Sequence, residues 1–284
     1  MHSVSVIIRC RNEERFIGET LRMVGGQRVD VPFEIVVVDS GSTDRTIEIV
    51  GAFGVRLFEI PPASFTFGYA LNYGIDRAQG SIICNTSAHC VPSGESWLRY
   101  LVEPILKSQA DATFGRQLPV KGLNAWEEVL LQKDFPDTED LKGRLPFSNA
   151  NCAFLRSMWA EMKFDEELQS WEDYLWYLRQ KDRYRFLYRP EAAVFHSHPF
   201  SVKGMVERAY RDGMACRVFE RKYGIDLMQG SRPTAKAKMG VFLRDLGRYT
   251  GLFRQRGYWR HMLLIPYARF LAYRAYWKGY RAVA

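Results

Sequence analysis

The sequence lacks the features that mark a secreted or membrane-spanning chain. Its five cysteines are odd in number and none lies in a Cys-x-x-Cys pair, which favours reduced thiols in the cytosol over a disulfide framework. The chain does not open on a basic segment followed by a long apolar core, and it contains no run of about 18 apolar residues. These absences predict a cytoplasmic protein without a secretory signal or a transmembrane helix.

Acidic residues are nearly missing from the end of the chain. Residues 232–284 hold 12 Lys and Arg but one acid, Asp245, which gives a net charge of +11, whereas the rest of the chain carries −3. Aromatic residues are interleaved with these cations over 242–280. Such a segment can pack on its own domain as helix, lie on an anionic membrane surface, or bind single-stranded RNA. We expect one domain over 1–225 and a basic, aromatic-rich helical extension over 226–284.

Two common nucleotide-binding loops are also missing. The Gly-x-Gly-x-x-Gly fingerprint does not occur, which disfavours a dehydrogenase. No Gly-rich, Lys-bearing phosphate loop follows the first expected strand, which disfavours a nucleotidyltransferase.

What the sequence does contain is a regular alternation of strand and helix patterns. Strands are predicted at 4–8, 33–40, 55–60, 81–86 and 112–120, and helices at 11–27, 42–54, 67–80 and 93–109. This order predicts an α/β fold with a largely parallel sheet and helices on both faces. Ligands of such sheets bind at the carboxyl ends of the strands, here residues 9–13, 39–42 and 86–89.

Asp39 lies where the second strand ends. Its carboxylate can accept a hydrogen bond from a pyrimidine or a ribose hydroxyl, or it can cap the helix that follows. Ser42 or Thr43 is the expected N-cap of that helix. The residues alone leave both roles of Asp39 open.

Six segments together resemble glycosyltransferase family 2, and the resemblance covers about residues 4–215. In chain order they read VSVIIRCRNEERFIGETL, EIVVVDSGSTDRT, ALNYGIDRAQGSII, FSNANCAFLR, FDEELQSWEDYLWYLR and AVFHSH. The resemblance implies a GT-A fold, which is a Rossmann-like mixed and mostly parallel sheet flanked by helices. It also implies transfer of a sugar from a nucleotide donor with inversion at the anomeric carbon.

The resemblance implies that the nucleotide-sugar donor is bound by residues that follow the first, second and fourth strands and by one residue of a helix. Relatives often have Pro-x-Tyr-Asn-Glu after the first strand, and this chain has Arg-Cys-Arg-Asn-Glu. Arg11 therefore stands where an aromatic side chain packs on the base, and a guanidinium can stack there too. The implied nucleotide-sugar contacts are Arg9, Arg11, Asn12, Glu13, Asp39, Ser40 and Asn72, followed by Ser87, Ala88 and His89.

Ser87, Ala88 and His89 align with the Asp-x-Asp motif with which relatives hold Mg²⁺ or Mn²⁺. No carboxylate lies between Asp76 and Glu95. One interpretation is that His89 binds a divalent cation together with His196 or His198, and Mn²⁺ accepts nitrogen ligands more readily than Mg²⁺ does. A second is that His89 contacts the diphosphate directly and no metal is needed. The third is that the site has decayed.

Glu172 and Asp173 align with a carboxyl pair that lies under the acceptor in this family. Inverting transfer needs one carboxylate to take the proton of the acceptor hydroxyl, and the resemblance implies that Asp173 is this base. The alternative is that both acids merely favour a helix N-terminus. The implied acceptor contacts are Asn149, Asn151, Trp171 and Arg179.

The function implied is that of a hexosyl- or deoxyhexosyltransferase in polysaccharide biosynthesis. The donor would be a nucleotide-diphosphate sugar and the acceptor a glycan or a lipid-linked glycan. We expect a cytoplasmic enzyme that is peripheral on the inner face of the plasma membrane, and no nucleic-acid partner. The alternative is a non-catalytic protein that keeps the GT-A fold and only binds nucleotide sugars or glycans.

Overall fold

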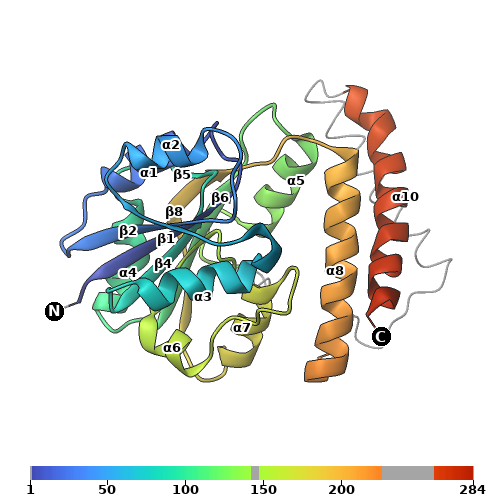
Figure 1. Cartoon of the computed structure of the whole chain (residues 1–284). Coiled ribbons are helices and arrows are strands. Elements are labelled where there is room, and N and C mark those ends of the chain that lie inside the picture. Colours follow the sequence, from blue (N-terminus) through green and yellow to red (C-terminus); the bar gives the residue numbers. More distant parts are fainter. Residues whose placement is uncertain (1, 142–146, 226–258, 284) are drawn as a thin grey trace. The chain divides into compact units, whose positions relative to one another are not determined.

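The protein is described by a computed structural model that covers residues 2–141, 147–225 and 259–283 (Figure 1). The chain divides into two compact units. The first contains residues 1–168 and 172–198, and the second contains 169–171 and 199–284. The long helix before residue 225 thus belongs with the last helix, which differs from the expected boundary at 225/226. The first half of the expected basic segment, 242–258, lies outside the described residues.

The first unit is built on one mixed sheet. Its described strands are β1 (Val4–Cys10), β2 (Phe33–Asp39), β3 (Arg56–Glu59), β4 (Ile82–Ser87), β5 (Cys90–Pro92), β6 (Ala112–Leu118), β7 (Asn151–Leu155) and β8 (Phe186–His196). They lie in the order β3-β2-β1-β4-β7-β6-β8-β5. The β3-β2-β1-β4 half is parallel, β7 is antiparallel to both of its neighbours, and β5 is antiparallel to β8.

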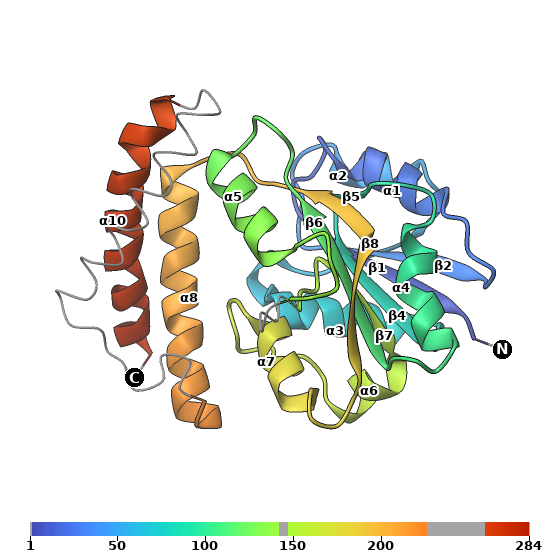
Figure 2. The ribbon, with the colours of Figure 1, turned by 180° about the vertical axis from the view of Figure 1, so that it is seen from behind.

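Helices cover both faces of this sheet (Figures 1 and 2). One core contains apolar residues of α1 (Ile17–Gly25), α2 (Thr46–Gly51) and α4 (Trp97–Leu106), and the other contains those of α3 (Phe67–Arg77), α6 (Arg156–Glu161) and α7 (Glu172–Gln180). Strand β1 shows the cause, because its side chains alternate between the faces: Val6 and Ile8 enter the first core, and Ile7 enters the second. The α/β class and the mostly parallel sheet are confirmed.

The strand order places a binding edge beside β1. The chain steps outward from β1 to β2 and β3, then returns to β4 on the other side of β1. This reversal is a topological switch point, where open α/β sheets bind ligands outside the carboxyl ends of their strands. In the parallel registers Arg9 pairs with Ser87 and Cys10 pairs with Asp39. The ends of all three strands therefore meet at one edge.

Helix α2 differs from its prediction. It begins at Thr46 after Arg45, not after Ser42 or Thr43, and Arg45 makes no side-chain cap. The reason is local, because Ser42 and Thr43 are held in the preceding turn by Asp39 and Asn12.

The second unit contains α8 (Val202–Tyr223) and α10 (Trp259–Ala282), which run side by side in the same direction (Figure 1). Two glycines bring their backbones together. A Cβ atom on Gly213 would lie 1.9 Å from the carbonyl oxygen of Tyr276, and one on Gly279 would lie 2.0 Å from that of Tyr210. Only hydrogen at these positions allows the approach.

Replacing Gly213 by alanine is therefore expected to destabilise the second unit by about 1–3 kcal/mol, because the two helix backbones must move apart. Urea or thermal unfolding followed by circular dichroism measures this cost. Gly204→Ala is the matched control, since Gly204 lies on the same helix and a Cβ atom there has no neighbour closer than 3.6 Å. Equal stability of the two variants would contradict the packing described.

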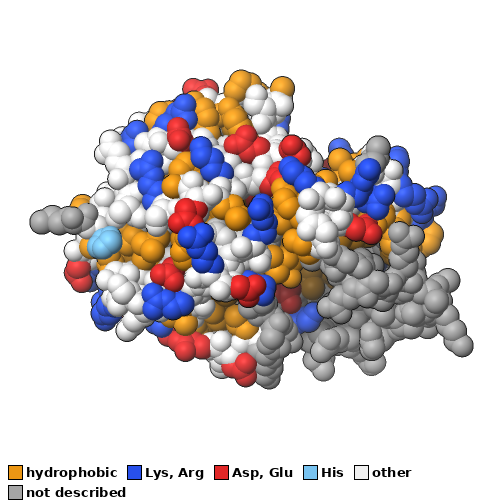
Figure 3. Space-filling model, turned by 90° about the horizontal axis from the view of Figure 1, so that it is seen from below, with side chains coloured by type: hydrophobic (Ala, Val, Ile, Leu, Met, Phe, Trp, Pro, Cys, Tyr) orange, Lys and Arg blue, Asp and Glu red, His pale blue; other side chains and the backbone are white. Residues whose placement is uncertain are grey.

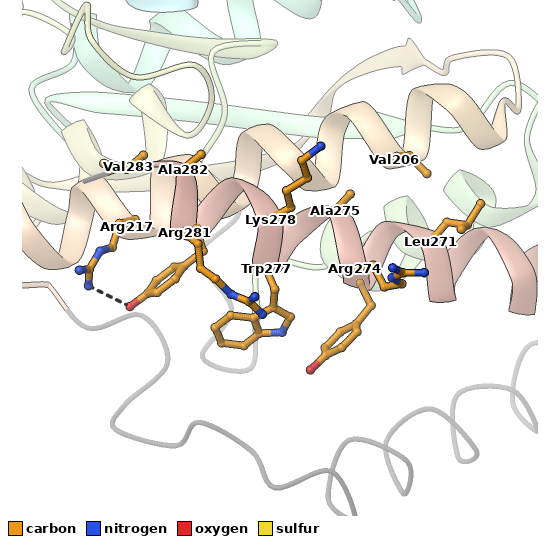
Figure 4. A pocket seen from close by; sticks show the side chains of 12 residues that line it. Val206, Arg217, Leu271, Arg274, Ala275, Trp277, Lys278, Arg281, Ala282 and Val283 are labelled. Atoms are coloured by element: carbon orange, nitrogen blue, oxygen red, sulfur yellow. Dashed lines mark hydrogen bonds between the residues drawn. The ribbon is translucent and has the colours of Figure 1, made fainter.

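A groove follows α8 and α10 (Figure 4). Its lining includes Arg217 from α8 and Trp277 and Arg281 from α10. Arg217 donates a hydrogen bond of 3.4 Å from Nη1 to the hydroxyl of Tyr280.

Across the described part of the chain, no helix combines the length and hydropathy that a membrane span requires.

Charge is distributed differently over the two units. Lys and Arg intermix with Asp and Glu over the visible face of the first unit, whereas cations predominate on the visible part of the second (Figure 3). Helix α10 has no acidic residue.

All five cysteines are buried and none forms a disulfide, as predicted. Burial raises the pKa of the Cys84 and Cys90 thiols, which keeps them protonated.

Candidate active site

The candidate active site lies at the switch point, where one arginine connects two of the predicted motifs. Arg9 is the penultimate residue of β1 and pairs with Ser87 of β4. Its Nη2 lies 3.5 Å from the hydroxyl of Ser87, and its Nη1 lies 3.9 Å from Oε1 of Glu172, the first residue of α7. Ser87 is two residues before His89, and Glu172 directly precedes Asp173. Two motifs separated by more than eighty residues in the sequence thus flank one side chain.

The two carboxyl groups of α7 lie in different environments. Glu172 is 4% exposed, and its Oε1 accepts a hydrogen bond of 3.3 Å from the amide of Asn149. Asp173 is half-buried, and its two oxygens accept hydrogen bonds from the backbone N–H groups of Asn149 and Tyr174, at 3.1 and 2.8 Å. Backbone donors favour the ionised form of a carboxyl group. Asp173 is therefore the better candidate for a general base, and Asn149 positions the pair.

Burial and mutual repulsion perturb both carboxyl groups. Burial, reinforced by the charge of Asp173, raises the pKa of Glu172 to about 7, while Arg9 opposes the shift. Burial also raises the pKa of Asp173, against the hydrogen bonds from Asn149 and Tyr174 and the charge of Arg9. Strongly perturbed carboxyl groups at the ligand-binding edge of a sheet are typical of catalytic sites.

This shift predicts a pH-dependent stability that Glu172→Gln removes. The unfolded carboxyl group ionises near pH 4.5 and the folded one near pH 7, so wild type loses stability as the pH rises through this interval. Relative to E172Q, its free energy of unfolding should fall by about 2–3 kcal/mol between about pH 5 and pH 8. Urea titrations at several pH values measure the difference. Parallel curves for the two proteins would show that Glu172 is not held protonated.

Three histidines form a cluster next to this site. One ring nitrogen from each of His89, His196 and His198 lies within 4.8 Å of the others. The antiparallel pairing of β5 with β8 creates the cluster, because Cys90 pairs with His196 and His89 directly precedes Cys90. His89 therefore lies close to both histidines of the His-Ser-His segment, as expected.

Each of the three rings is oriented by an oxygen atom. The Nδ1 atoms of His89, His196 and His198 lie 2.6, 2.5 and 3.0 Å from side-chain oxygens of Glu13, Gln117 and Glu127, in that order. When Nδ1 carries the proton of such a hydrogen bond, the lone pair of a neutral imidazole is on Nε2. Metal-binding histidines usually have an oxygen partner of this kind.

The sequence alone does not predict that Gln117 and Glu127 orient the histidines. Gln117 lies in β6 beside another polar residue, Arg116, and nothing in the local sequence marks it out. Glu127 is one of two acids in the first turn of α5 (Ala125–Asp134). A third missed residue is Asn85, which is fully buried in β4 and donates a 3.1 Å hydrogen bond to Asn149.

The residues expected to hold the nucleoside are largely engaged in building the loops at this edge. Asp39 is 0% exposed and accepts hydrogen bonds of 2.8 Å from the backbone N–H groups of Gly41 and Ser42. Ser40 is buried and donates to the carbonyl of Cys10. Asn12 accepts a 2.8 Å hydrogen bond from the backbone of Thr43, joining the loops after β1 and β2. Asp39 does not cap α2, which begins at Thr46, and its carboxylate holds the turn after β2 instead. Its contact with the nucleoside stays a prediction.

Three other predicted contacts have structural roles instead. Asn72 makes four side-chain hydrogen bonds to the protein, which exhausts its capacity. Ala88 is buried in the apolar core. Asn151 is 1% exposed, accepts a hydrogen bond from Trp97, and donates to the backbone carbonyl groups of Arg116 in β6 and Ala192 in β8. These interactions occupy the three side chains within the protein, and the donor role given to Asn72 and Ala88 and the acceptor role given to Asn151 stay predictions.

The remaining predicted contacts lie on more accessible surface. Arg11 is exposed in the loop after β1, and Arg179 is exposed in the last turn of α7. Trp171 is half-buried in a left-handed backbone conformation, and its ring makes an edge contact with Phe219 in the second unit. Contacts of these three side chains with a donor or an acceptor stay predictions.

The fold and the switch-point site define an α/β protein of the GT-A type. A model described as Glycosyl transferase family 2 matches residues 5–161, more than half of the chain, and the chain belongs to this family. The O-antigen chain rhamnosyltransferase RfbN of Salmonella typhimurium is 24% identical over 285 residues, an alignment that covers 89% of both chains.

Solved structures share the fold. The mannosyltransferase PcManGT of Pyrobaculum calidifontis, in complex with GDP-Man and Mn²⁺, has a TM-score of 0.62 at 20% identity, covering 98% of this chain and 86% of its own. Residues 1–349 of TarS of S. aureus, in complex with UDP, have a TM-score of 0.57 at 19% identity, covering 99% and 90%. These likenesses support the GT-A architecture.

Proposed function

We propose that this protein is an inverting glycosyltransferase that moves a hexose or deoxyhexose from a nucleotide-diphosphate sugar to a glycan or lipid-linked acceptor during polysaccharide biosynthesis. The observation that carries the proposal is the meeting of the Glu172–Asp173 pair and the Ser-Ala-His motif around Arg9 at the switch point. The rhamnosyltransferase RfbN acts on an O-antigen chain, which supports the acceptor class and a deoxyhexose donor.

In the proposed reaction Asp173 takes the proton of an acceptor hydroxyl. The acceptor oxygen forms a bond to the anomeric carbon from the face opposite the leaving group. The bond from that carbon to the diphosphate oxygen breaks, and its electron pair leaves with the diphosphate. Asn149 keeps Asp173 in place through its backbone N–H group. Asp173 is the more accessible carboxyl group of the pair, and its two backbone hydrogen bonds favour the ionised form that a base requires.

We further propose that His89, His196 and His198 hold a divalent cation. The donor set fits, because three imidazoles lie close together and each has an oxygen partner at Nδ1. Nitrogen ligands favour Mn²⁺, Co²⁺ or Zn²⁺ over Mg²⁺. When bound, such a cation supplies positive charge to the departing diphosphate.

Thermal-shift measurements with UDP-, GDP- and dTDP-sugars, with and without Mn²⁺, test the donor. A stabilising sugar nucleotide is then incubated with glycan or lipid-linked acceptors, and the product is identified by mass spectrometry and its anomeric configuration by NMR. We expect transfer with inversion. A protein that binds a nucleotide sugar but turns it over with no acceptor and no metal would instead be the non-catalytic binding protein.

We also propose that α10 lies on an anionic membrane surface. Tyr267 and Phe270 are 58% and 54% exposed on this helix, which has no acid, and Arg274 and Lys278 are exposed beside them. Aromatic rings at the headgroup level and cations near anionic lipid favour such binding. Co-sedimentation with phosphatidylglycerol vesicles should exceed that with phosphatidylcholine vesicles. Equal binding to both, or none to either, would contradict the membrane role.

A further inference from the structure

The guanidinium group of Arg9 is buried without sufficient partners. Its side chain is 12% exposed, and two of its three nitrogens, Nε and Nη1, are buried without a hydrogen-bond acceptor. The ring of Phe67 covers the group, with the guanidinium carbon 4.8 Å from the ring centre. Buried donors are normally satisfied in folded proteins, so an arginine in this state calls for an explanation.

The neighbours of Arg9 do not compensate its charge. The hydroxyl of Ser87 is neutral and lies at 3.5 Å, the outer limit of a hydrogen bond. The carboxyl group of Glu172 is 3.9 Å away, beyond hydrogen-bonding distance. Burial and the adjacent Asp173 favour the protonated form of Glu172, which weakens the one ion pair that Arg9 makes among the described residues. A cation that is dehydrated and incompletely paired is costly, unless a bound anion completes its contacts.

We propose that Arg9 binds a phosphate group of the donor diphosphate. The inference rests on the proposed function, because the anion is part of the nucleotide-sugar donor. Arg9 lies at the carboxyl end of β1, at the switch point, between the strand that leads to His89 and the helix that begins with Glu172. The proposed reaction places the bond between sugar and diphosphate near these two elements, because one leads to the His cluster and the other carries the proposed base.

The chemistry of guanidinium suits this role. It is planar, always charged and rich in donors, so it binds phosphate oxygens through hydrogen bonds that strengthen as negative charge develops on a leaving diphosphate. Phe67 keeps the group in place and free of water on one side. A lysine would keep the charge but not the geometry of the donors.

Binding of nucleoside diphosphates to the full-length protein tests the proposal. UDP, GDP and dTDP are each titrated calorimetrically into wild type, Arg9→Met and Arg9→Lys, at fixed Mn²⁺. For the nucleotide that wild type binds, we expect R9M to weaken the affinity by about 30-fold or more and R9K to lie between them. The control Arg22→Met, which removes an exposed arginine of α1, should bind as wild type does.

Thermal unfolding without ligand separates this role from a structural one. Since two of the three guanidinium nitrogens of Arg9 lack acceptors, R9M should unfold at the same temperature as wild type or a higher one. If R9M binds the diphosphate as tightly as wild type, the role of Arg9 is overturned and the transferase function stands. If wild type binds none of the three diphosphates, both the proposed function and the role of Arg9 are wrong. If R9M unfolds well below wild type and R9K binds no better than R9M, Arg9 is a structural residue and the proposal is wrong.

Discussion

Asp173→Asn is expected to lower the turnover number by about 10²–10⁴, because a positioned general base contributes about this factor. Asparagine keeps the size of the side chain, but its single carboxamide oxygen can accept from only one of the two backbone N–H groups, those of Asn149 and Tyr174, that the carboxylate of Asp173 accepts from. The loss of one hydrogen bond should cost about 1–3 kcal/mol of stability and leave the protein folded. Sugar transfer is measured through the amount of nucleoside diphosphate released. Donor binding is measured by calorimetry on the same preparations.

Asp182→Asn provides the matched control for this substitution. Asp182 lies just after α7, its side chain is 87% exposed, and its partner is Lys181 on the surface. We expect D182N to transfer sugar at the rate of wild type within about twofold, since an exposed ion pair contributes little. A D173N protein that retains about a third or more of the wild-type turnover number would remove Asp173 from the role of base.

Alanine at His89, His196 or His198 is expected to weaken the binding of Mn²⁺ or Zn²⁺ by about 100-fold or more, because each replacement removes one proposed ligand. Glu127→Ala should have a smaller effect, about 10–100-fold, since Glu127 only orients His198. Metal content after gel filtration and calorimetric titration measure binding without relying on activity. Chelation by EDTA should abolish sugar transfer, and Mn²⁺ should restore it.

His2→Ala is the control for the loss of an imidazole. His2 is exposed at the start of the chain and lies 3.2 Å from the hydroxyl of Ser81, away from the cluster. H2A should bind metal as wild type does. If the wild-type protein binds no divalent cation and transfers sugar fully in EDTA, the cluster contacts the diphosphate directly, which is the alternative that needs no metal.

Local chemistry explains why much of the fold was predictable. Each strand around β1 is a short apolar run bounded by turn residues, and the helices α1, α3 and α4 carry apolar residues at helical spacing, so local pattern and final structure agree. Exact helix starts were less predictable. Thr46 begins α2 because a turn built by Asp39 uses the residues that would otherwise cap the helix earlier.

The candidate site was only partly predictable from the sequence. The identity of a polar residue does not reveal whether its hydrogen bonds are made within the protein or with a ligand. The resemblance implies ligand contacts for Asn72 and Asn151, whereas in the structure their side chains form hydrogen bonds within the protein. Gln117 and Glu127 were missed since their function depends on histidines far away in the chain.

The sequence by itself determined the α/β class, the order of the segments and the two motifs around His89 and Asp173, because these depend on residues close together in the chain. Only the tertiary structure decided which side chains meet. The pairing of Cys90 with His196 assembles the three histidines, and the neighbouring ends of β1 and β4 place Arg9 between Ser87 and Glu172. Strand order and register fix these contacts, and neither is encoded in any local stretch of residues.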